Sequence, residues 1–168
     1  MAWQEPPDDL LLDNPLWQYV LTLWAHERFA QHCLEAQSQG QAVIRILVAL
    51  FCASRDQYAP DAEPVGIGQW REAVTTQLRT LRMQLPKQST TSPVRETVKK
   101  AELEAEQVEL AWWWRNLADN ESVTEPGLSR AGIARHNLDS LLPESDPHLR
   151  ASLVGLWREI TEANGEPS

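Results

Sequence analysis

The sequence predicts an all-α protein, an antiparallel helical bundle of about five main helices plus two shorter C-terminal helices. Apolar residues recur at spacings of three and four along most of the 168 residues, the period of a helix with one buried face. No stretch alternates polar and apolar residues over the length of a strand with β-branched enrichment. Capping residues and prolines stand where successive apolar runs begin or end. These three observations favour the packing of helix on helix.

Three helices are predicted in the first third of the chain. The first spans about residues 13–26, where two residues that can cap a helix precede Pro15 in the first turn. The second spans residues 27–38 and ends before Gly40, because glycine accepts the left-handed conformation common at helix ends. The third, residues 41–55, is apolar on nearly every side, so we expect other elements to surround it.

Polar or proline-containing segments separate the remaining helices. Residues 58–68, with two prolines and two glycines, are typical of a loop, and the next helix, residues 69–85, ends at a proline. The longest helix begins with a Ser-Pro pair and spans residues 92–117. Two weaker helices are predicted near the C-terminus, over about residues 128–141 and 146–160.

The same pattern divides the chain into four segments. We expect an acidic flexible lead over residues 1–12, a helical bundle domain over 13–118, a polar break over 119–127, and a C-terminal helical pair packing on the bundle over 128–168. The N-terminus does not start basic and then turn apolar, as a secretory signal does. The most apolar run carries an arginine and is shorter than the ~20 residues of a membrane span. We therefore expect a cytoplasmic protein with no membrane partner.

Composition narrows the classes of partner. The formal charge of −9 argues against binding of nucleic acid or anionic membranes by the whole surface. Cys33 and Cys52 are too few for a disulfide framework and stand among apolar residues, so we expect buried, reduced thiols. Eight tryptophans accompany only two phenylalanines and two tyrosines, and tryptophan suits the edges of cores and interfaces.

Short motifs over residues 14–114 carry a resemblance to a known family. They are Leu16-Trp17-x-Tyr19, Trp24-Ala25, Cys33-Leu34-x-x-Gln37 with Gly40, Gln69-Trp70-Arg71-x-x-Val74, Leu78-Arg79-x-Leu81-Arg82 and Lys100-Ala101-Glu102-Leu103-Glu104-Ala105-Glu106. In these motifs the chain resembles a family of uncharacterised proteobacterial proteins, domain of unknown function 2390. The resemblance covers about three-fifths of the chain and implies no activity, cofactor or ligand.

The chemistry-bearing residues form no pattern typical of a catalytic or metal site. His26 and His32 are six residues apart, whereas metal-binding pairs on one helix are three or four apart. The long helix carries a glutamate cluster: Glu102, Glu104, Glu106 and Glu109. A carboxylate metal site of this kind also needs a histidine three residues after a glutamate, so a solvated acidic face is favoured. We expect no catalytic residue, no metal ligand and no cofactor.

Charge is segregated along the chain. Residues 71–100 carry seven basic and two acidic side chains, a net charge of +5, so the remainder carries −14. Arg79, Arg82 and Lys87 are the candidate anion-facing residues, because phosphate contacts use such clusters. No aromatic residue is interleaved for base stacking, so the sequence favours pairing of this basic segment with the acidic lead and the glutamate cluster. Nucleic acid is therefore disfavoured as a partner.

The longest helix is predicted to have two apolar faces. One is formed by Val94, Val98, Ala101, Ala105, Val108 and Trp112, and the other by Leu103, Leu110, Trp114 and Leu117. At ~100° per residue the second face lies near 180° from the first. Left exposed, it would be a large apolar patch, so we expect cover from the C-terminal helices or an interaction face for a partner.

These observations favour a non-enzymatic helical protein that acts through protein–protein interaction, with an unidentified protein or as a homo-oligomer. An alternative is a small-molecule-binding protein or small enzyme with a pocket lined by Trp17, Trp24 and Trp70. A second alternative is an RNA-associated factor that uses the basic segment, residues 71–100.

Overall fold

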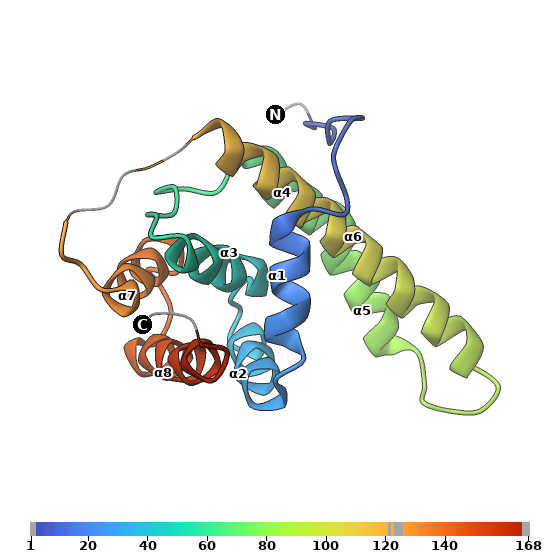
Figure 1. Cartoon of the computed structure of the whole chain (residues 1–168). Coiled ribbons are helices and arrows are strands. Elements are labelled where there is room, and N and C mark those ends of the chain that lie inside the picture. The colour runs from blue at the N-terminus through green and yellow to red at the C-terminus, as the bar shows by residue number, and fades with distance from the viewer. Residues whose placement is uncertain (1–2, 121, 123–125, 166–168) are drawn as a thin grey trace.

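The computed structural model describes residues 3–120, 122 and 126–165, and within these ranges it contains only helices and loops (Figure 1). The helices are α1 (Pro15–Trp24), α2 (Glu27–Ser38), α3 (Val43–Ser54), α4 (Val65–Trp70), the π-helical turn η1 (Arg71–Thr75), α5 (Thr76–Gln84), α6 (Ser92–Asp119), α7 (Arg130–Leu141) and α8 (Pro147–Ala163). Because α4, η1 and α5 are continuous, five main helices precede two C-terminal ones. The all-α prediction is confirmed.

Among the described helices, α1, α7 and α8 begin at a residue whose side chain caps the helix. The Oδ1 atom of Asn14 accepts a hydrogen bond from the backbone N–H of Trp17 at 2.9 Å, and Pro15 opens α1. One boundary differs from the prediction, since α4 begins inside the segment expected to be a loop. Gly66 lies inside this helix, where its missing side chain leaves room for the ring of Trp112; a Cβ atom there would collide with that ring. Glycine here permits close packing rather than a turn.

Helix α3 is the centre of the body of the protein. Nine of its twelve residues are buried, as its all-round apolar surface predicts. It contacts α7 most extensively and also α1, α2 and α6, while α8 packs on α2 and α7. Both cysteines are buried and free, and burial raises the pKa of each thiol to about 12. The expectation that both thiols are buried is confirmed.

The same helix explains what covers the second apolar face of α6. Leu110 is 1% exposed and belongs to the core, and the ring of Trp114 meets the edge of Phe51 on α3 with centroids 6.0 Å apart. Helix α6 packs on α1 and α3 on this side, so the cover expected from the C-terminal helices is wrong. Because α3 is apolar all round, it needs a neighbour on every side and stands between α6 and the C-terminal pair.

The acidic lead lies along α4 and α6 instead of extending freely. The ring of Trp3 packs against that of Trp70 with centroids 6.4 Å apart, and the backbone N–H of Gln4 donates to Oε1 of Gln69 at 3.1 Å. Asp9 pairs with Arg115 of α6 at 2.6 Å. The lead is thereby held at the end of α6 that is nearer the body.

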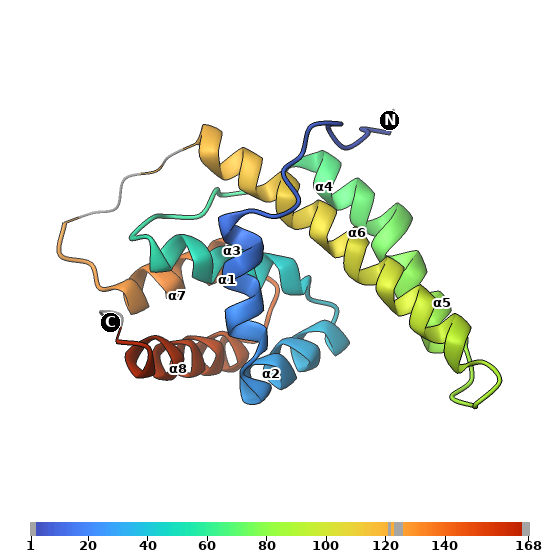
Figure 2. The same ribbon diagram turned by 45° about the vertical axis from the view of Figure 1, so that its right-hand side comes forward.

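A two-helix arm extends away from the body (Figures 1 and 2). We define the arm as residues 71–109, which comprise η1, α5, the following loop and the facing part of α6. Helix α5 packs on η1 and α6 and makes no other extensive helix contact within the described chain. None of its nine residues, all of them described, is buried. Although α6 has 28 residues, no described helix combines the length and apolar character needed to cross a membrane.

Asn137 on α7 fixes the chain that leaves α3. Its side chain is fully buried, and Nδ2 donates to the carbonyl oxygens of Ala49 and Gln57 at 3.0 and 3.1 Å. Its Oδ1 atom accepts from the backbone N–H of Ala59 at 2.8 Å. The amide of Asn137 therefore binds three backbone groups at once.

We therefore expect Asn137→Ala to lower the free energy of unfolding by about 2–3 kcal/mol, because it leaves the buried N–H of Ala59 without its partner. Asn164→Ala, at an exposed position after α8, is the matched control and should change it by less than about 0.5 kcal/mol. Urea unfolding followed by circular dichroism measures both. Equal stability of the two variants would contradict this account of the Asn137 amide.

Candidate interaction surface

Arginine–glutamate pairs hold the two helices of the arm together where the arm joins the body. Arg71 binds both carboxylate oxygens of Glu63 at 2.7 and 2.8 Å, and its Nε donates to Glu109 at 2.9 Å. Glu109 is 0% exposed and also accepts from the hydroxyl of Thr75 at 2.7 Å. Arg45 of α3 joins the group through Glu63 at 3.1 Å. The root of the arm is thus tied to the central helix by buried charge.

Burial and charge act in opposite directions on these carboxyl groups. Burial raises the pKa of Glu63, but the hydrogen bonds and charges of Arg71 and Arg45 outweigh it, so that pKa lies below its usual value. For Glu109, burial dominates over Arg71 and Thr75, and the pKa is raised. The guanidinium of Arg71 is itself held in its charged form by the two carboxylates. Loss of Arg71 would therefore leave Glu109 buried without a basic partner and Glu63 with Arg45 alone.

A second group of pairs continues toward the tip of the arm. Arg79 binds Glu102 at 2.9 Å and Glu106 at 2.8 Å, and Arg82 also binds Glu102. The basic segment therefore faces the glutamate cluster, as the sequence favours. The expected solvated face is wrong for Glu102 and for Glu109, which are buried, and fits only Glu104, which stays exposed. At ~100° per residue, helical spacing places Glu102, Glu106 and Glu109 along one side of α6, but it does not indicate which helix lies opposite.

The π-helical turn η1 aligns the hydrogen-bond donors of η1 and α5 with the glutamates of α6. In a regular α-helix, two residues four positions apart differ by about 400°, which is 40° more than one turn. Side chains repeated at every fourth position therefore shift gradually around the helix. In η1 the N–H of Thr76 bonds to the carbonyl of Arg71, five residues back, which widens the turn. The wider turn offsets the drift, and Arg71, Thr75 and Arg79 all reach glutamates of α6.

A strip of apolar side chains runs along one side of the arm. It comprises Val74, Leu78, Leu81 and Leu85 from the η1–α5 side and Val94, Val98, Ala101 and Val108 from α6. At ~100° per residue, the apolar residues of each helix lie about a quarter turn around that helix from its residues that form the ion pairs. The two helices are antiparallel, and the quarter turns have the same sense, so both halves fall on one side of the arm. We call this set the apolar strip.

The apolar strip is only partly covered. Val98 is buried between the helices, whereas Leu81 is 46% exposed and Val94 is exposed to a similar degree. The other exposed positions of α5 are uncharged: Thr76, Gln77, Thr80, Met83 and Gln84. The charged residues of α5 are Arg79 and Arg82, and both turn toward α6. Depletion of charge around exposed apolar side chains is typical of the core of a protein interface.

A family model described as "Protein of unknown function (DUF2390)" matches residues 15–112. The chain belongs to this family. No curated protein and no solved structure matched the chain. The DUF2390 match begins with α1 and ends within α6, so it includes the whole arm, with its ion pairs and apolar strip, and stops before α7 and α8.

The residues predicted as an interaction face do not form one exposed surface in this DUF2390 protein. Leu103 is half exposed on α6, whereas Leu110 is in the core and Trp114 and Leu117 are partly buried against it. The apolar strip lies on a different side of α6. Its members were visible in the sequence as helical stripes, but the sequence did not indicate that they would stay partly uncovered.

The three tryptophans predicted to line a pocket have separate environments. Trp17 packs partly buried against the core, and Trp24 is exposed on α1. The indole N–H of Trp70 donates to the carbonyl of Ala105 at 3.0 Å, and its ring contacts Trp3. Of the candidate anion-facing residues, Arg79 and Arg82 are bound to glutamates, and Lys87 is exposed and makes no ion pair within the described chain.

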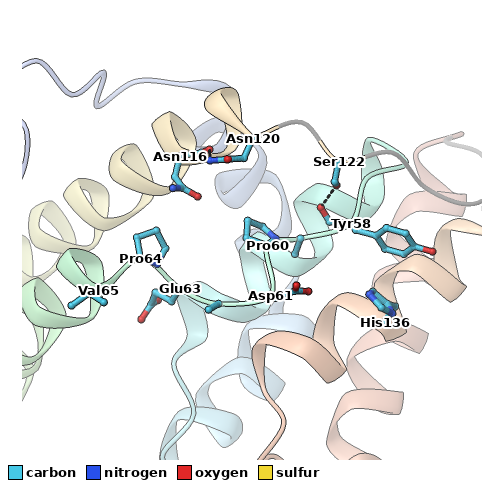
Figure 3. A pocket seen from close by; sticks show the side chains of 12 residues that line it. Tyr58, Pro60, Asp61, Glu63, Pro64, Val65, Asn116, Asn120, Ser122 and His136 are labelled. Atoms are coloured by element: carbon cyan, nitrogen blue, oxygen red, sulfur yellow. Dashed lines mark hydrogen bonds between the residues drawn. The ribbon is translucent and has the colours of Figure 1, made fainter.

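An open concavity that no sequence pattern indicates lies between the loop after α3, the end of α6 and α7 (Figure 3). Its volume is about 720 Å³. The ring of Tyr58 packs on His136 with centroids 4.5 Å apart, and the hydroxyl of Ser122 donates to the carbonyl of Tyr58 at 2.6 Å. Asp61 lies on the same side (Figure 3). In the described residues no three or more His, Cys, Asp or Glu side chains are grouped so that they could hold a metal ion.

The buried pairing makes a first prediction for the arm. Arg71→Met should lower the free energy of unfolding by about 3–5 kcal/mol, because Glu63 and Glu109 are then buried without their shared partner. Arg28→Met removes an exposed arginine from a surface pair with Glu159 and should cost far less. Thermal and urea unfolding compare the two variants. Similar losses would show that burial of the Arg71 group contributes little.

Glu106 makes the stability of the arm depend on pH. Burial, together with the charges of Glu102 and Glu109, raises its pKa to about 7 despite the opposing charge of Arg79. The folded state therefore holds this proton up to about pH 7, whereas the unfolded chain releases it near 4.5, and stability falls as pH rises between these values.

We expect Glu106→Gln to lose less stability than the wild type when urea unfolding is repeated at pH 5 and pH 8. Glu104→Gln, at an exposed position of the same helix, is the matched control and should follow the wild type at both values. If Glu106→Gln and the wild type change in parallel, the proton on Glu106 does not couple to folding.

Proposed function

We propose that this DUF2390 protein acts through protein–protein interaction or self-association at the apolar strip of its arm. One observation carries the proposal: no described element covers the exposed apolar residues of the two-helix arm, among them Leu81 and Val94. Apolar patches of this kind on soluble proteins are typical of interaction sites.

The arrangement of charge supports this function. An amphipathic hairpin ordinarily buries apolar residues between its helices and turns charge to solvent. In this arm the arginines and glutamates lie between the helices, and several apolar residues remain at the side. The ion pairs hold the helices together without using the full apolar surface. That surface is then free for a partner.

The alternative functions have weaker support. An RNA-associated role would use Arg79 and Arg82, but their guanidinium groups already bind Glu102 and Glu106. A small-molecule role would use the concavity beside Tyr58, which is open to solvent and is not lined by the predicted tryptophans. At the arm, the sequence pattern, the exposure of apolar residues and the distribution of charge all favour binding of a partner. At each of the other two sites, at least one of these features is lacking.

A variant of the exposed leucine at the middle of the strip tests the proposal. Leu81→Glu should abolish the recovery of proteins that co-purify with tagged wild type from a native lysate, because a charge is placed in the contact. Leu34→Glu, on α2, is the matched control, since Leu34 is 51% exposed and lies outside the strip. Circular dichroism first establishes that both variants fold. Recovery unchanged by Leu81→Glu but lost with Leu34→Glu would place the interaction elsewhere.

A further inference from the structure

We infer that the partner of the apolar strip is a second copy of this chain, and that two arms pack antiparallel as a four-helix bundle. The inference rests on the proposed function and names the partner at the same surface. It draws on the register of the strip, the distribution of charge along the arm and the absence of charged side chains on the exposed side of α5.

The register of the strip is self-complementary. Val94, Ala101 and Val108 are seven residues apart on α6, so a two-fold axis beside Ala101 places Val94 of each copy over Val108 of the other. Arg79 and Arg82 both bind Glu102, the neighbour of Ala101, so Leu81 lies at the same level on α5. The axis therefore brings the two Leu81 side chains together and the two Ala101 residues together.

Charge selects the antiparallel direction. Residues 71–109 carry seven basic and six acidic side chains, a net charge of +1, so the rest of the chain carries −10. Parallel arms would place two strongly acidic bodies side by side, whereas antiparallel arms place them at opposite ends.

The ends of the arm are complementary in the same arrangement. Residues 86–95 at the tip carry two basic and no acidic side chains, a net charge of +2. Residues 3–13, the lead, carry four acidic side chains and no basic one, and lie where the arm meets the body. In the antiparallel pair, the tip of each arm reaches the region of α6 beside the lead of the other copy. Attraction at both ends favours this register.

The exposed side of α5 accepts a copy of itself. Where a helix lies across its own copy, a charged residue near the axis faces an identical charge. The exposed positions flanking Leu81, Thr80 among them, are uncharged from Thr76 to Gln84. The contact of α5 with its own copy at the axis therefore contains no like-charge repulsion.

Mass measurements test the inference. Light scattering on the full chain should give twice its mass of 19.1 kDa at high concentration, with dissociation on dilution. Leu81→Glu should weaken the dimer at least tenfold, because two glutamates meet at the axis. Met83→Glu is the matched control, since Met83 is 71% exposed but lies on the opposite side of α5, and it should leave the dimer intact.

Cross-linking tests the register. With a short bifunctional maleimide, Leu81→Cys should join two chains efficiently and Met83→Cys should not, because only position 81 meets its own copy. The native thiols of Cys33 and Cys52 are buried and do not compete. Equal cross-linking at the two positions would overturn the antiparallel register.

The outcomes separate this inference from the proposed function. If the wild type is monomeric at all concentrations, the inference of a second copy as partner is overturned. The proposed function still holds if Leu81→Glu abolishes capture of another protein. If capture does not depend on the arm, the proposed function is overturned as well. A dimer that is insensitive to Leu81→Glu places self-association elsewhere and overturns the inference.

Discussion

The pairing of arginines on η1 and α5 with glutamates on α6 is the constraint on which the rest of the structure depends. Glu109 is fully buried, and an ion of its kind in the interior is tolerated only with good geometry and further hydrogen bonds. The planar guanidinium of Arg71 supplies this by binding two carboxylates at once, and Thr75 supplies the extra donor. Through Glu63 and Arg45 the same group reaches α3, so the direction of the arm is fixed relative to the core.

In the proposed function, the ion pairs between α5 and α6 hold the arm together and the apolar strip binds the partner, so different residues serve the two roles. In a helical hairpin held together by apolar contacts, most apolar residues are buried between the two helices, and few remain exposed for a partner. Here charge supplies much of the contact between α5 and α6, and residues with coiled-coil spacing, such as Leu81 and Val94, stay partly exposed. The arm can therefore keep its shape while its apolar strip is free. A surface that is preformed in this way loses little conformational entropy when it binds.

What the sequence predicted well was local. Helix periodicity and the caps at Asn14 and Pro15 depend on neighbouring residues, so the elements were placed to within a few positions. What it predicted poorly depended on distant residues. In the sequence Gly66 indicates a loop, because nothing nearby shows that Trp112 lies against it. The sequence likewise favours solvent around Glu102, because its opposing arginines come from another helix. The strip was visible as a pattern, but its exposure depends on which helices fail to cover it.

The charge segregation of the sequence takes a different form in the folded chain. The excess of basic residues over 71–100 is largely neutralised once α6 brings its glutamates back along the same arm. Only the tip, beyond the last pair at Arg82, keeps a basic surplus, and the lead keeps an acidic one at the other end. A near-neutral arm with opposite charges at its two ends is electrostatically suited to an antiparallel copy of itself. Under the proposal of an antiparallel dimer, the linear charge pattern bears on assembly more directly than on any affinity for phosphate.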